Sequence, residues 1–112
     1  MRRILTTGLL CGTLALSALA QDVATAEHHK LLGLDAYWKL HFRQAEAHFQ
    51  AAVDANPQDA AAYYYLGYTV YKIAEPKPAN DPGKRRAAEL FAKAYALDPL
   101  FQPDWGPGGG DR

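Results

Sequence analysis

The sequence predicts an all-α fold in which four helices form two helix-turn-helix units. The first observation is the stretch from Ala60 to Tyr71, which carries five of the seven tyrosines and has apolar residues at the i, i+3, i+4 and i+7 spacing of a helix face. The second observation is a recurrence at fixed distance, because Leu32-Gly33 is matched by Leu66-Gly67 34 residues later. Helical periodicity and a repeat of this length together predict an array of short helices.

The helix predicted around Ala60 to Tyr71 has two stripes of side chains. The apolar stripe that should face the core consists of Tyr63, Leu66, Gly67 and Val70. A second stripe, about 100° further round the helix, consists of Tyr64, Tyr68 and Tyr71. We expect the first stripe to pack and the second to be available for binding, while Tyr65 belongs to neither.

Residues 1–20 are predicted to be a signal peptide. Arg2 and Arg3 give a positive start, an apolar run follows from Ile4 to Leu19, and small residues at Ala18 and Ala20 suit a signal peptidase. The mature protein is therefore expected to be periplasmic or secreted, with Sec and twin-arginine export both open. An uncleaved membrane anchor is the alternative, although the run is shorter than a spanning helix requires.

A second recurrence defines the boundaries of the two units. Four residues of the first unit recur 42 positions later, where Ala45, Phe49, Ala52 and Pro57 are matched by Ala87, Phe91, Ala94 and Pro99. The larger spacing indicates an insertion near 75–83, where three prolines exclude helix interior. The predicted organisation is a leader at 21–25, units at 26–59 and 60–101, and a flexible Gly- and Pro-rich tail at 102–112.

The helices are expected near 23–39, 43–55, 59–74 and 84–97. Asp59 and Asp81 are the predicted N-caps of the third and fourth helices, and Pro82 follows Asp81 at a favoured first helical position.

These recurring residues resemble the signature of the tetratricopeptide repeat family, a 34-residue helix-turn-helix unit. The resemblance covers Ala26 to Pro99. It implies close helix packing at the Gly and Ala positions and an α-solenoid fragment of two repeats. The first unit departs from the signature at His29 and Ala36, where aromatic residues are usual.

The resemblance also implies a concave groove, lined by the first helix of each unit, that binds a peptide or protein segment. Carried onto this chain, the groove residues are Lys30, Leu34, Tyr37, Trp38, Tyr64, Tyr68, Tyr71 and Lys72. Flat aromatic rings suit extended peptides because they offer large contact area at small entropic cost. The alternative is that these tyrosines only pack against the second helices or against Trp105.

Two further features of the sequence allow more than one interpretation. Lys84, Arg85 and Arg86 form a possible basic docking patch for an acidic partner, or simply a solvated face. Because an array of two units leaves its ends open, Phe101 and Trp105 could act as a lid, two chains could associate as a homodimer, or a partner could cover the end.

Composition excludes several functional classes. With 12 basic and 12 acidic residues the chain is too near neutral to predict a nucleic-acid partner. Its single cysteine, Cys11, lies in the predicted signal peptide, and no nucleophile-base pair or phosphate loop suggests an enzyme. No cofactor or metal site is predicted, because His28, His29, His41 and His48 lack a strong ligand spacing.

The sequence therefore predicts an exported adaptor or scaffold that binds a protein segment in an aromatic groove. The first alternative is a structural subunit that self-associates through its open repeat end. The second alternative is a periplasmic carrier of metal or haem that uses the histidines.

Overall fold

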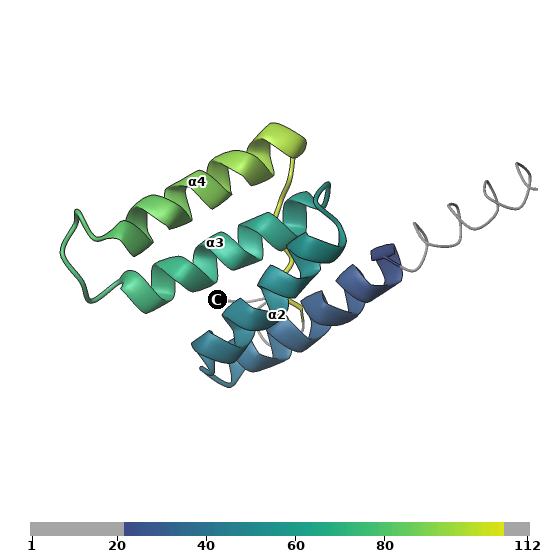
Figure 1. Cartoon of the computed structure of the whole chain (residues 1–112), viewed down its shortest axis with the longest axis horizontal. Coiled ribbons are helices and arrows are strands. Elements are labelled where there is room, and N and C mark those ends of the chain that lie inside the picture. Colours follow the sequence, from purple (N-terminus) through teal and green to yellow (C-terminus); the bar gives the residue numbers. More distant parts are fainter. Residues whose placement is uncertain (1–21, 107–112) are drawn as a thin grey trace, which may run out of the picture.

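The structure is a computed structural model that describes residues 22–106, and every regular element in that range is a helix (Figure 1). The elements in chain order are a helix over residues 22–38, α2 (Phe42–Ala55), α3 (Ala60–Ala74) and α4 (Pro82–Leu97). The all-α prediction is confirmed, and each predicted helix boundary lies within two residues of the observed one. Residues 1–20, predicted to be a signal peptide, and the tail beyond Gly106 lie outside the described residues. None of the described helices is long and apolar enough to cross a membrane.

Both predicted N-caps are confirmed. The Asp59 carboxylate accepts a hydrogen bond from the backbone N–H of Ala62 at 3.3 Å, and the Asp81 carboxylate accepts one from Gly83 at 2.8 Å. Each bond satisfies an N–H that has no partner inside its own helix. Pro82 occupies the first turn of α4, where a missing N–H costs nothing. The proline-rich insertion consequently falls between α3 and α4 as a loop.

The first helix ends at a residue with left-handed backbone geometry. Leu40 has a φ of 64°, and the next residue, His41, donates its N–H to the carbonyl of Ala36 at 2.9 Å. This six-to-one bond is the closing bond of a Schellman motif. The left-handed position of that motif, here Leu40, usually holds glycine. The turn reverses the chain so that α2 runs back along the first helix.

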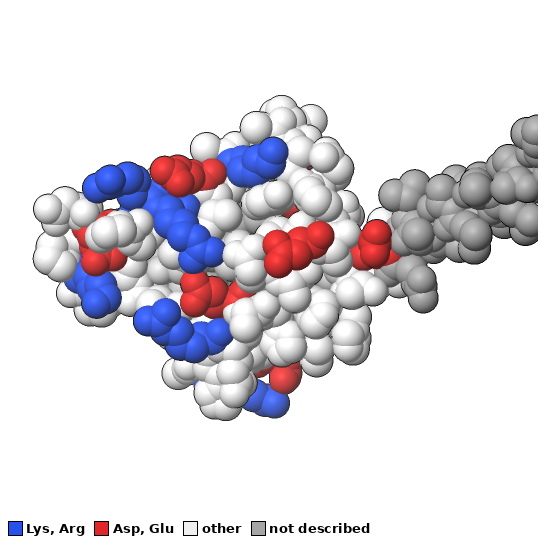
Figure 2. Space-filling view, viewed as in Figure 1, with Lys and Arg blue, Asp and Glu red and all other residues white. Residues whose placement is uncertain are grey.

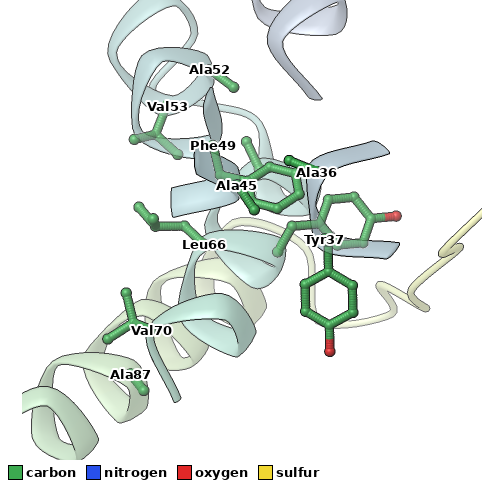
Figure 3. Close-up of a cluster of buried hydrophobic side chains, with 11 residues drawn as sticks. Ala36, Tyr37, Ala45, Phe49, Ala52, Val53, Leu66, Val70 and Ala87 are labelled. Carbon is green, nitrogen blue, oxygen red and sulfur yellow. The ribbon is translucent and has the colours of Figure 1, made fainter. Parts of the chain in front are cut away.

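The core lies where the helices of both units meet, as the cluster in Figure 3 shows. Phe49 and Leu66 are fully buried in it. The repeat glycine Gly33 is required by close approach, because a Cβ at this position would lie 2.6 Å from the Phe49 ring. A Cβ at Gly67 would lie 3.1 Å from the Leu90 Cβ, a looser fit. Both glycines of the Leu-Gly recurrence therefore lie where a neighbouring helix packs close to the backbone.

Helix α3 buries more of its surface than the predicted apolar stripe alone would cover. Leu66, Gly67 and Val70 are buried as expected, and Tyr63 is half-buried. Tyr65, which the two-stripe interpretation left without a role, is only 5% exposed. The reason is that α3 packs against α2, α4 and the segment that follows α4.

Candidate peptide-binding face

The segment after α4 returns across α3 toward the first helix (Figure 1). The Phe101 ring lies 5.4 Å from Tyr64 on α3 and 6.2 Å from Tyr95 on α4. Trp105 continues past α4 and packs between α3 and the first helix. Phe101 and Trp105 therefore fold back on the helices, and Trp105 reaches the residues predicted to bind a partner.

The Trp105 ring is surrounded by aromatic side chains from two helices. Its centroid lies 4.7 Å from Tyr37, 4.9 Å from Tyr65 and 5.1 Å from Tyr68. Tyr64 and Trp38 follow, each at 6.1 Å. We call the surface formed by Tyr37, Trp38, Tyr64, Tyr65 and Tyr68 the aromatic face.

Polar groups of the aromatic face bind the main chain of the returning segment. The Trp38 indole Nε1–H donates to the carbonyl oxygen of Trp105 at 2.7 Å. The Tyr65 hydroxyl donates to the carbonyl oxygen of Asp104 and accepts the backbone N–H of the same residue at 3.1 Å. These bonds join side chains to peptide groups, so their geometry does not depend on which side chains the bound segment carries.

Four of the eight predicted groove residues are brought together here. Tyr37 is buried, while Trp38, Tyr64 and Tyr68 are half-buried. Tyr65 is the member of the aromatic face that the sequence prediction missed. A signal was present, because Tyr65 follows Ala62 by three positions and precedes Thr69 by four, and all three are buried on one further stripe of α3.

Lys30 lies in an internal ion-pair network. Its Nζ is 2.7 Å from Glu27 and 2.7 Å from Asp59, and its side chain is only 13% exposed. Burial lowers the pKa of Lys30, but hydrogen bonds and the charges of Asp59 and Glu27 outweigh burial and leave the pKa above its ordinary value. Lys30 thus links the first helix to the N-cap of α3.

The other predicted groove residues lie outside the Trp105 cluster. Leu34 packs against the core. The Tyr71 ring lies 6.2 Å from Tyr68 and is 41% exposed. Lys72 forms an ion pair with Glu75 at 3.2 Å. Tyr71 is therefore the member of the predicted tyrosine stripe that remains most open to solvent.

Burial raises the pKa of three phenols of the aromatic face, those of Tyr37, Tyr64 and Tyr65. Desolvation, with smaller contributions from the charges of Tyr68, Glu75 and Tyr64, raises the pKa of Tyr37 to about 12. The pKa of Tyr64 is also raised, chiefly by burial. Burial raises the pKa of Tyr65 as well, although its bond to the Asp104 backbone acts in the opposite direction. A phenol is already neutral at physiological pH, and the raised pKa values keep these hydroxyls protonated to more alkaline pH, so that the Tyr65 hydroxyl remains a donor.

Of the three cations of the predicted basic patch, Arg85 is exposed, whereas Arg86 and Lys84 bond to neighbouring segments. Arg86 bonds to the Glu46 carboxylate at 2.9 Å and to the Gln50 side chain at 3.0 Å, which ties α4 to α2. Lys84 donates to the carbonyl of Lys77 in the insertion loop at 2.6 Å. Figure 2 shows Lys and Arg side chains next to Asp and Glu side chains on the face in view.

The structure brings together a histidine pair that the sequence did not single out. The Nδ1 atoms of His29 and His48 lie 3.2 Å apart, a hydrogen bond between the first helix and α2. Within residues 22–106, no three His, Cys, Asp or Glu side chains form a group that could hold a metal ion.

Comparison with known proteins supports the repeat assignment. The chain is similar to a curated relative, Tetratricopeptide repeat protein 37 from Xenopus laevis, with 32% identity over 76 residues that cover 68% of this chain. The chain spans about 5% of the length of that relative. No protein-family model matches the chain, and no solved structure matches it significantly. The Leu-Gly recurrence, the paired helices and this similarity show that the chain belongs to the tetratricopeptide repeat family.

Proposed function

We propose that this repeat protein is an exported interaction module, an adaptor or scaffold, that holds an extended segment of a protein partner on its aromatic face. One observation supports this proposal above the others. The aromatic face already packs an extended segment, residues 101–106, through ring contacts to one tryptophan and hydrogen bonds to two successive carbonyl groups. A surface that accommodates one such segment has the chemistry to accommodate another.

The composition of the face favours a peptide as its ligand. Rings of tyrosine and tryptophan are rigid and amphipathic, so they bury area with little loss of side-chain entropy. Tyr65 and Trp38 supply donors at a spacing that matches consecutive peptide groups. Binding of this kind requires only contact, and no step of covalent chemistry.

Binding is tested by capture from an exported protein fraction, followed by mass spectrometry and titration of the purified partner. Tyr68→Ala should weaken binding by about tenfold or more, because Tyr68 contacts the occupying ring directly. Tyr71→Ala is the matched control and should bind like wild type, since Tyr71 lies outside the aromatic face. Equal affinity of wild type and Tyr68→Ala, with both folded by circular dichroism, would reject the proposal.

Export is tested separately by N-terminal sequencing of the protein recovered from cells. Cleavage after Ala20 should give a mature chain that starts at Gln21 in the periplasm or medium. Recovery of the chain in the cytoplasm with Met1 intact would contradict this part of the proposal.

Self-association is a second candidate function. It is favoured by large apolar side chains that remain exposed, namely Leu31 at 67%, Leu40 at 70% and Leu100 at 87%. Sedimentation equilibrium of the mature chain decides between the two candidates. A monomer across micromolar concentrations would remove the structural-subunit interpretation.

A further inference from the structure

We infer that the aromatic face selects segments with the chemistry of Pro103-Asp104-Trp105, a tryptophan preceded by an acidic residue and a proline, and that this chain's own segment competes with the partner. The inference rests on the proposed function and adds the class of ligand and the means of regulation. It is supported by the contacts that residues 101–106 make with the aromatic face.

The main-chain contacts could be made by any segment that does not carry proline at the position of Asp104, where a backbone N–H is required. Tyr65 bonds to both the carbonyl and the N–H of Asp104, and Trp38 bonds to the carbonyl of Trp105. All of these acceptors and donors on the segment are peptide groups. A segment from another protein could therefore replace residues 104 and 105 without loss of a polar partner.

Side-chain contacts provide the selectivity. The Trp105 ring lies within 6.1 Å of all five rings of the aromatic face, so a smaller side chain would leave part of that enclosure unfilled. Pro103 restricts the residue before it to extended backbone. The Asp104 carboxylate accepts the N–H of Gly106 at 3.0 Å and closes a turn centred on the tryptophan. Each of the three residues thus contributes to the bound shape.

The segment is attached in a way that permits release. Residues 101–106 are outside any helix, so detaching them breaks no helical hydrogen bond. Much of the segment is open to solvent, since Gln102, Pro103 and Asp104 are exposed, and the preceding Leu100 is 87% exposed. Local openings of this kind occur without global unfolding when few buried contacts are lost.

Competition follows from the covalent connection. A segment joined to the face by a short linker acts at an effective concentration in the millimolar range. The affinity of an external segment is reduced in proportion to the fraction of molecules whose own segment is detached. Weakening the internal segment should therefore strengthen external binding.

The test uses the full mature chain and a fluorescein-labelled peptide with the sequence of residues 99–106, followed by fluorescence anisotropy. Trp105→Ala should bind this peptide about tenfold tighter than wild type or better, because the internal competitor has lost its main contact. The same peptide with its tryptophan replaced by alanine should not bind. Leu100→Ala is the matched control, since Leu100 is exposed beside the segment, and should behave like wild type.

Two results would overturn the inference. One is a folded Trp105→Ala chain that binds the peptide no more tightly than wild type. The other comes from hydrogen exchange measured on the wild-type protein, so it tests the inference even if Trp105→Ala fails to fold. The Trp38 indole N–H should exchange with deuterium faster than the backbone N–H of Leu66, and equal rates would mean that the segment leaves only on global unfolding.

The same data separate this inference from the proposed function. If the labelled peptide fails while an identified partner still binds in a manner sensitive to Tyr68→Ala, the proposed function stands and the ligand class is wrong. If neither the peptide nor any partner binds at the aromatic face, both are wrong.

Discussion

Leu40 holds a left-handed backbone position at the end of the first helix, with a φ of 64° and a side chain that is 70% exposed. A side chain in this region costs about 1 to 2 kcal/mol, which glycine avoids. Leu40→Gly should therefore raise the free energy of unfolding by about 1 kcal/mol in urea denaturation. Leu40→Ala, which keeps a Cβ, should bring no gain. A loss of stability in Leu40→Gly would mean that the leucine side chain has a packing role.

The two repeat glycines should differ in their tolerance of a methyl group. Gly33→Ala places a Cβ 2.6 Å from the fully buried Phe49 ring, which has no room to move, and should destabilise by about 1 to 3 kcal/mol. Gly67→Ala meets its nearest atom at 3.1 Å, and the higher helix propensity of alanine, about 1 kcal/mol, should offset most of that strain. Thermal or urea unfolding of both variants measures the difference. Equal losses would contradict the packing described here.

The buried tyrosines predict a loss of stability at alkaline pH. The pKa of Tyr37 rises from 10.0 to about 12 on folding, so the folded state binds this proton more tightly than the unfolded state. The stabilisation is fully present below pH 10 and is lost as the pH rises toward 12. The free energy of unfolding should be flat from pH 7 to 9 and then fall, and the fall should be smaller in Tyr37→Phe. An unchanged alkaline profile in Tyr37→Phe would contradict the burial of this phenol.

Arg86 on α4 connects the two repeats. Its guanidinium reaches Glu46 and Gln50 on α2, but its side chain is 44% exposed, so solvent weakens the ion pair. Arg86→Met should lower stability by about 0.2 to 1 kcal/mol, whereas Arg85→Met should change it little. Salt titration of both variants is the check, because an ion pair weakens as ionic strength rises. Identical behaviour would show that α4 does not depend on this contact.

Helix α3 shows how much of an element its sequence determines. Periodicity located the helix, its Asp59 cap and the buried positions Leu66 and Val70, because these depend on residues close together in the chain. The same pattern left Tyr65 without a role and placed Tyr71 with Tyr68. Both assignments depend on where Trp105 packs, 40 residues beyond Tyr65 in the sequence. Spacing within one helix carries no information about such a distant contact.

At the scale of the whole molecule, the repeat signature predicted the order and pairing of the helices, since its small residues specify where helices approach. The candidate site was predicted in part. Tyr37, Trp38, Tyr64 and Tyr68 were named and do lie together, while Lys30, also expected in the groove, pairs with Asp59. Opposite charges from separate helices cannot be matched by spacing alone. The sequence also could not decide whether the open end of the repeat array is covered by a lid, a second chain or a partner.

The ring of Trp105 anchors the segment of residues 101–106 on the aromatic face. Two-dimensional NMR of the protein tests this packing most directly, through nuclear Overhauser effects between Trp105 ring protons and the rings of Tyr37, Tyr65 and Tyr68. We predict cross-peaks to all three, because the ring centroids lie 4.7 to 5.1 Å apart. A Trp105 indole with random-coil shifts and no cross-peaks to these tyrosines would contradict the account.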